Sequence, residues 1–267
     1  MQESTSENNN SNSLDIVRQF LTLAAIVGAF AVNVISNVNP PGGVPIGEIS
    51  NTVFKNVLII PANYAFAIWG LIYLGLFVFA IYQALPRQRE QPDLRKIGYL
   101  LVIASIAQSA WVYLFLGRMF TYSVVAMVLI LIPLIAAYLI LGIGTNPVTR
   151  AKRWCVHYPI SIYLSWISVA TIVNVACALY SQGWNRWGLT SEIWTAIMLF
   201  AASAICDLVL TARRDIPYTG VTVWALVAVA VKQWSNQRLG LIALGCAVLL
   251  VIMTFVMQGV RRRDYYG

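Results

Sequence analysis

Long apolar runs, each close to the length of a membrane-spanning helix, repeat along this 267-residue chain. A helix needs about 20 apolar residues to cross about 30 Å of hydrocarbon. Eight runs reach or approach that length, at residues 15–37, 62–85, 97–117, 121–144, 155–180, 192–212, 217–233 and 239–260. With 59% hydrophobic and 10% charged residues, the chain has more apolar surface than one soluble core can bury. The sequence therefore predicts an all-α, polytopic transmembrane bundle of about eight spans.

Basic residues are distributed unevenly between the predicted loops. If all eight runs span, 13 of the 18 Lys and Arg residues lie on one side of the membrane, and the net charge of +8 is concentrated there. Cytoplasmic loops of membrane proteins carry such an excess. We therefore expect both termini in the cytoplasm of a bacterial inner, or thylakoid-type, membrane. Membrane lipid is the expected partner, nucleic acid is not, and a homodimer is compatible with the sequence.

The chain divides into four predicted segments. A polar, disordered tail occupies residues 1–13, a five-helix core occupies 14–182, three further helices occupy 183–260, and a basic tail occupies 261–267. The core contains a first loop, residues 37–60, that is rich in Pro and Gly and longer than ordinary connections. Loops of this length are often lids, so we expect it to close over the bundle.

A carboxamide lies deep in the fifth run. Trp166, Ala170 and Asn174 are spaced i, i+4 and i+8, so a helix places them on one stripe. Facing lipid, the Asn174 side chain would lack partners at a cost of about 2–7 kcal/mol, so the stripe should face other helices or a cavity.

The second and third runs and the rest of the fifth contribute aromatic and neutral polar residues, namely Trp69, Tyr73, Gln108, Trp111, Tyr113, Phe115, Tyr163 and Thr171. Such surfaces suit a flat, apolar ligand better than an ion. Plain helix packing is the alternative.

Ionisable residues are scarce at depth, and no P-loop, GxGxxG, HExxH or GxSxG motif is present. The single histidine, His157, starts the fifth run and is interpreted as an interfacial residue. Asp207 lies well inside an apolar run. One interpretation is a residue near the cytoplasmic end that pairs with Arg213 or Arg214 or meets water, and a proton or ion site is the other. Acid–base catalysis and metal binding need several converging ionisable groups. We therefore expect no enzyme activity, no metal and no obligatory cofactor.

Three of the runs carry motifs similar to those of the tryptophan-rich sensory protein family, also called the TspO/MBR, translocator protein or peripheral benzodiazepine receptor family. The motifs are Pro61 followed by Trp69-x-x-x-Tyr73, then Gln108-x-x-Trp111-x-x-x-Phe115, then Trp166-x-x-x-Ala170-Thr171-x-x-Asn174. Their order and placement resemble the family over residues 15–182. The chain departs from the family pattern in several respects. Gln108 stands in place of Asn, Phe66 is one position from the expected aromatic, and Pro159 lies further before Trp166 than the family's proline does. The first loop is also longer, and three C-terminal spans are additional.

The resemblance implies a five-helix bundle whose cavity, under the first loop, binds a tetrapyrrole such as a porphyrin, or a sterol-like ligand. By motif, Trp69, Trp111, Trp166, Ala170 and Asn174 would line that cavity, with Gln108 in place of the family's Asn. Activities proposed in the family include sensing, transport and porphyrin photodegradation by the cavity tryptophans.

Three functions follow as hypotheses. The first is a membrane receptor or carrier for a hydrophobic planar ligand, with Tyr73 added to the motif residues that bind it and with a sensory or transport role. The second is a proton-coupled secondary transporter that uses Asp207. The third is an assembly or interaction protein of a membrane complex, whose additional spans dock onto a partner.

Overall fold

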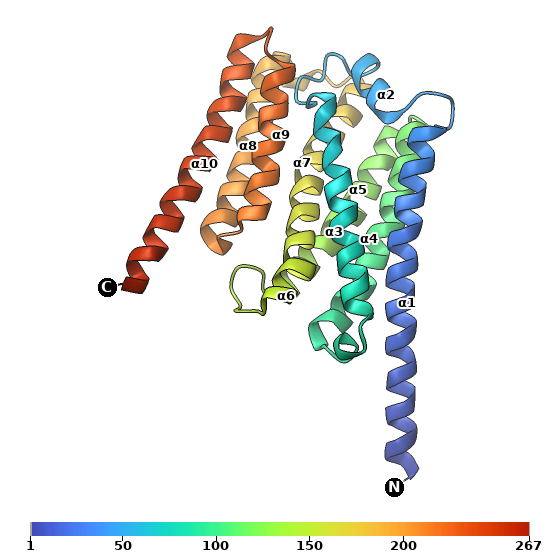
Figure 1. Ribbon diagram of the computed structural model, residues 1–267. Helices are drawn as coiled ribbons and strands as arrows, with labels where there is room; N and C mark the ends of the chain where they lie inside the picture. The colour runs from blue at the N-terminus through green and yellow to red at the C-terminus, as the bar shows by residue number, and fades with distance from the viewer. Residues whose placement is uncertain (1, 267) are drawn as a thin grey trace.

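The computed structural model describes residues 13–259, side chains included, and this part of the chain contains helices and no strand (Figure 1). The predicted tails, residues 1–13 and 261–267, lie outside it except for Ser13. The long helices are α1 (Gln2–Val38), α3 (Ile68–Ala84), α4 (Pro92–Leu116), α5 (Phe120–Ile140), α7 (Tyr158–Ser181), α8 (Ser191–Arg213), α9 (Ile216–Lys232) and α10 (Gln237–Tyr266). The prediction of an all-α polytopic bundle is confirmed.

Seven helices of the described chain are long and apolar enough to cross a membrane, and the predicted span at 217–233 is the exception. Its helix, α9, has 17 residues, so it rises only about 26 Å, less than the hydrocarbon thickness. It begins at Ile216, directly after the N-cap Asp215. Because α7, α8 and α10 all pack against α9, protein rather than lipid surrounds most of it.

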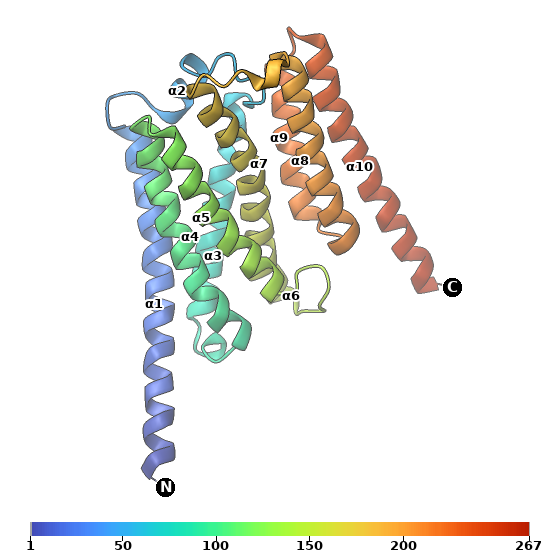
Figure 2. The same cartoon turned by 180° about the vertical axis from the view of Figure 1, so that it is seen from behind.

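The helices form two groups (Figures 1 and 2). One contains α1, α3, α4, α5 and α7, and the other contains α8, α9 and α10, which join the first chiefly through α9 and α7. Small buried hydroxyl residues line this junction: Ser165 donates to the carbonyl oxygen of Tyr218 at 2.7 Å and lies 3.1 Å from the Thr222 hydroxyl. Small polar side chains let two helices approach closely while their polar groups remain paired.

The first loop, predicted as turns and a lid, also contains helical structure. It contains the short helix α2 (Ile46–Thr52) and leads into a 3₁₀ turn, Asn63–Ala67. Residues 46–62, called the cap below, lie across one end of the bundle, opposite the end where α10 finishes (Figures 1 and 2). Phe54 of the cap is 1% exposed, and its ring centroid lies 4.7 Å from that of Phe120. A buried aromatic side chain therefore anchors the cap to the helices.

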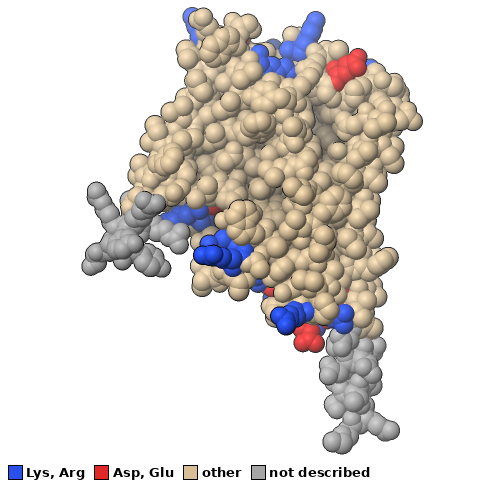
Figure 3. Space-filling view, in the orientation of Figure 1, with Lys and Arg blue, Asp and Glu red and all other residues tan. Residues whose placement is uncertain are grey.

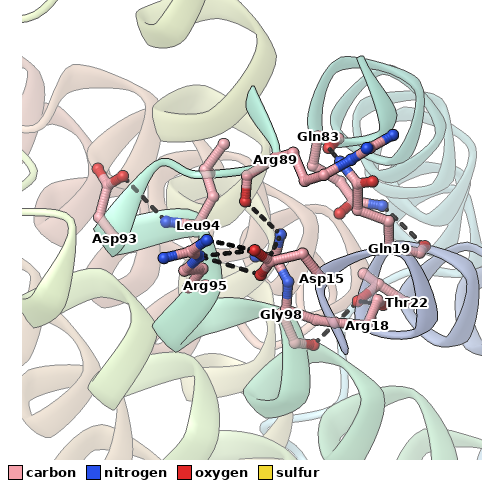
Figure 4. A network of polar contacts seen from close by, with 10 residues as sticks. All are labelled: Asp15, Arg18, Gln19, Thr22, Gln83, Arg89, Asp93, Leu94, Arg95 and Gly98. Carbon is pink, nitrogen blue, oxygen red and sulfur yellow. Dashed lines mark hydrogen bonds and ion pairs between the residues drawn. The ribbon is translucent and has the colours of Figure 1, made fainter. Parts of the chain in front are cut away.

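On the face shown in Figure 3, charged side chains lie toward the two ends of the molecule, with an uncharged surface between them. Figure 4 shows a polar network at one end, where α1 meets α4. Asp15 of α1 pairs with Arg95 of α4 and lies 3.6 Å from Arg18, which is only 2% exposed. The Arg18 guanidinium also donates to the carbonyl oxygen of Arg89 at 3.0 Å. At Gly98, an added Cβ would lie 3.0 Å from the Cγ atom of Arg18, so a glycine there lets α4 approach α1.

Candidate functional site: a tryptophan-lined cavity

A cavity of about 50 Å³ lies between the core helices and the cap. Its walls include three tryptophans from three helices, Trp69 of α3, Trp111 of α4 and Trp166 of α7. Ala170 and Asn174, one and two turns beyond Trp166, line it as well. The structure thus brings together five of the seven ligand-binding residues proposed from the sequence.

Asn174 links three helices beside this cavity. Its side chain is 3% exposed, and its Oδ1 atom accepts a hydrogen bond from the Trp111 indole N–H at 3.0 Å. Its Nδ2 atom donates to the Ser123 hydroxyl of α5 at 3.0 Å. The carboxamide therefore serves both interpretations of the sequence: it connects helices through buried hydrogen bonds, and it forms part of a cavity wall.

Aromatic edges and faces fix the shape of the cavity. The Phe66 ring meets Trp166 edge-on, with centroids 6.0 Å apart and planes at 83°. The ring centroids of Trp69 and Tyr163 lie 6.1 Å apart, also edge to face. Those of Trp111 and Phe115 lie 5.3 Å apart, with the ring planes tilted by 32°. Edge-to-face pairs hold aromatic rings in defined orientations. Phe66 lines the cavity although it stands one position away from the expected aromatic.

The remaining two predicted residues lie outside the cavity wall. Tyr73 is buried behind Trp69, and its hydroxyl donates to the carbonyl oxygen of Ala29 in α1 at 3.1 Å. Gln108 is also buried, and neither polar atom of its side chain has a hydrogen-bond partner in the described chain. Tyr73 therefore contributes by supporting Trp69, whereas Gln108 carries an unsatisfied amide, which costs about 1–3 kcal/mol.

Sequence reasoning did not identify several wall residues. Met127 comes from α5, Cys177 extends the stripe of Asn174 by one turn, and Ile46, Ser50, Ile60 and Pro61 come from the cap. The helical period of α7 could have revealed Cys177, because it lies three positions after Asn174. Nothing in the sequence indicates which cap residues face inward. The described residues of the wall include no charged side chain, so the cavity suits an apolar ligand with a few neutral polar groups.

The second helix group holds the cap over the cavity. Gln233, at the C-terminal end of α9, donates from Nε2 to the carbonyl oxygen of Leu58 at 2.8 Å. The Ala62 N–H donates to the carbonyl oxygen of Ala228 at 3.0 Å. Lys232 adds a hydrogen bond from its ammonium group to Asn51 Oδ1 at 2.9 Å. The cap therefore rests on α9 as well as on the core helices.

Asp207 lies on α8, in the second helix group and away from the tryptophan cavity. It forms no ion pair with Arg213 or Arg214 in the described chain, so the structure contradicts that pairing, whereas its partly exposed side chain is compatible with contact with water. Its Oδ1 atom is buried and has no hydrogen-bond partner among the described residues.

A helical bundle with a tryptophan-lined cavity beneath an ordered cap defines the class: a polytopic membrane protein with an apolar space between its helices. The sequence profile of the TSPO-like protein family matches residues 19–256, and the chain belongs to this family. The matched region runs through α8 and α9 into α10, so it includes the three C-terminal helices. No curated protein and no solved structure matches the chain.

Proposed function

We propose that this protein is a membrane receptor or carrier that binds a hydrophobic planar ligand, a porphyrin or a sterol-like molecule, in the tryptophan-lined cavity. The observation that carries the proposal is the convergence of Trp69, Trp111 and Trp166 on one apolar space that also contains the Asn174 carboxamide. Indole rings can stack on a flat ligand, and the amide offers one neutral hydrogen-bonding group.

Ligand entry requires the cap to move. The cavity holds about 50 Å³, room for a few water molecules, whereas pockets for drug-sized ligands measure roughly 300–1,000 Å³. Ile46, Ser50, Ile60 and Pro61 form the cap side of the wall, so displacing the cap enlarges the same space. The proposed receptor therefore alternates between a closed cap and an open, ligand-accepting one.

Binding is tested by titrating the purified full chain with protoporphyrin in nonionic detergent and following quenching of tryptophan fluorescence. We expect saturable quenching at micromolar ligand. Ala170→Leu fills the cavity and leaves every tryptophan in place, so it should weaken binding by at least about tenfold, or about 1.4 kcal/mol. Val175→Leu, on the same helix but outside the cavity wall, is the matched control. Absence of quenching, or equal affinity in Ala170→Leu, would refute the porphyrin assignment.

A catalytic role is not part of the proposal. Photodegradation of a bound porphyrin by the cavity tryptophans is the one chemical outcome that binding itself would permit. It is tested by illuminating the complex and recording its absorption spectrum.

For location, we propose an inner or thylakoid-type membrane with both termini cytoplasmic. The described ends of α1 and α10 support this because both point toward the same end of the bundle (Figure 1).

A second candidate function, proton-coupled transport, rests on Asp207. A buried carboxylate oxygen without a partner is costly in a membrane helix, and such residues often bind a proton or an ion. The test is substrate uptake driven by a pH gradient in proteoliposomes. Asp207→Asn should abolish the uptake while leaving the folded protein intact, whereas unchanged uptake excludes this role. Copurification of a stable partner complex from native membranes would instead favour the assembly function.

A further inference from the structure

A second, larger cavity of about 380 Å³ opens at the opposite end of the molecule from the cap. Its walls are the loop after α5, the start of α7 and the turn between α8 and α9. These segments lie together at the lower end of the bundle in both ribbon views (Figures 1 and 2). It shares no wall residue with the tryptophan cavity, and we call it the basic pocket.

Three arginines line the basic pocket: Arg153, Arg213 and Arg214. The one carboxylate in the wall, Asp215, lies beside them, but none of the three forms an ion pair in the described chain. The charges of the wall therefore leave a positive excess in a concave site. Concave surfaces with one sign of charge concentrate ligands of the opposite sign.

Asp215 offsets one of the three positive charges but forms no ion pair with the arginines, because its oxygens accept hydrogen bonds from other groups. Oδ2 accepts hydrogen bonds from the Ser161 hydroxyl at 2.6 Å and from the Tyr138 hydroxyl at 2.9 Å. Oδ1 accepts from the Tyr218 backbone N–H at 3.1 Å, which caps α9. This carboxylate joins α5, α7 and α9 and has a structural task within the wall.

The wall is also held in shape. Arg213 donates from Nη1 to the carbonyl oxygen of Ile143 at 3.3 Å, and its guanidinium carbon lies 5.7 Å from the centroid of the Tyr138 ring. Gly144 has a φ of +82°, and a Cβ there would lie 1.9 Å from the Arg213 carbonyl oxygen, so only glycine fits the loop against α8. These contacts keep one arginine fixed and leave Arg153 and Arg214 exposed to an incoming ligand.

The start of α7 adds a polar group that has no partner. Residues Arg153–His157 form one π-helical turn, a distortion frequent at functional sites. His157 is 4% exposed rather than a surface residue of the membrane interface, and it lines the basic pocket. Its Nε2 atom has no hydrogen-bond partner in the described chain.

We propose that the basic pocket binds a phosphate group. A guanidinium has five N–H donors in a planar fork that matches phosphate oxygens in pairs. Among the described residues, only one of the three guanidinium groups, that of Arg213, donates a hydrogen bond within the protein, so most of their side-chain donors are available. A phosphate has more acceptor oxygens than a carboxylate and therefore uses several arginines better. An anionic lipid headgroup and a soluble phosphate compound share this chemistry, and both can reach the end of a membrane bundle.

The experiment uses the purified full chain in nonionic detergent with two probes. Inorganic phosphate is titrated by calorimetry, and binding of phosphatidylglycerol is compared with that of phosphatidylcholine by native mass spectrometry. The test variant is Arg153→Gln/Arg214→Gln, which removes the two exposed arginines and keeps Arg213. The control, Arg87→Gln/Arg150→Gln, removes the same charge from exposed residues outside the pocket wall.

We expect the test variant to weaken binding by at least about tenfold and the control to change it by less than about threefold. Binding of inorganic phosphate identifies a soluble ligand, and selective binding of phosphatidylglycerol alone identifies a headgroup; either supports the proposal. No binding of either probe, or equal losses in the test and control variants, overturns it. These outcomes are independent of porphyrin binding, because the two cavities share no wall residue.

Discussion

The hydrogen bond between Gln233 and the cap offers a direct test of how the second helix group controls the tryptophan cavity. Gln233→Leu keeps a side chain of similar length in its buried position but removes the donor to the Leu58 carbonyl, 2.8 Å away. Leaving a buried carbonyl without its partner costs about 1–3 kcal/mol. Because Leu58 is half-buried and water can reach part of it, we expect the lower part of that range, about 1–2 kcal/mol.

That free energy acts on the closed cap and leaves the core helices unchanged. A change of 1–2 kcal/mol multiplies the fraction of open molecules by about 5–30. Hydrogen exchange followed by mass spectrometry should therefore show faster exchange by that factor in peptides covering residues 46–62, with no change in α5. If a ligand enters through the open cap, its association rate should rise by the same factor.

The matched control is Gln237→Leu, an exposed glutamine at the start of α10 whose side chain has no hydrogen bond to the cap. It should leave exchange in the cap unchanged. Two results would show that the reasoning is wrong: unchanged exchange in the cap of Gln233→Leu, or faster exchange throughout the protein, which would indicate loss of global stability instead of cap opening.

Three further predictions concern the end of the molecule opposite the cap. Gly98→Ala brings a methyl group to 3.0 Å from the Arg18 side chain and should destabilise the protein by about 1–3 kcal/mol in detergent unfolding, whereas Gly70→Ala, with open space around it, should have little effect. Asp15→Asn removes the carboxylate from the buried Arg18 and should lower the thermal midpoint, and an unchanged midpoint would show that this network adds nothing to stability. Burial raises the pKa of Asp215 above its ordinary 3.8, so the folded state holds the proton more tightly than the unfolded state does. The free energy of unfolding therefore falls as the pH rises from 3.8 through the pKa of the folded state. Asp215→Asn should therefore flatten the pH dependence of the thermal midpoint above the ordinary carboxyl pKa of 3.8, and an unaltered slope would contradict the assignment.

Much of the fold follows from local properties of the sequence. Apolar runs of the length of a bilayer predict spanning helices, because a backbone in hydrocarbon must satisfy its hydrogen bonds within each segment. The spacing of Trp166, Ala170 and Asn174 likewise predicts one stripe, because 3.6 residues per turn place them above one another. Both predictions depend on residues close in sequence, and the structure agrees with both.

Contacts between distant segments could not be predicted in this way. Gln108 and Tyr73 carry the right chemistry and share helix faces with Trp111 and Trp69, but the cavity does not extend along α3 and α4 as far as either side chain. Asp215 was not singled out from the sequence, yet in the folded chain it meets hydroxyl groups from α5 and α7. From the sequence, the arginines of the basic pocket only add to the positive charge expected on the cytoplasmic side. The folded chain places them around one concave site.

The sequence by itself determined that this chain is an all-helical membrane protein with a tryptophan- and carboxamide-bearing stripe, because hydrophobic length and helical period are properties of single segments. The tertiary structure alone decided that the stripe faces a capped cavity, that α9 holds the cap, and that unpaired arginines meet at the other end. Those features depend on how whole helices rotate and pack against one another. Packing is settled by shape and by hydrogen bonds between residues as far apart as Leu58 and Gln233, which no local pattern records.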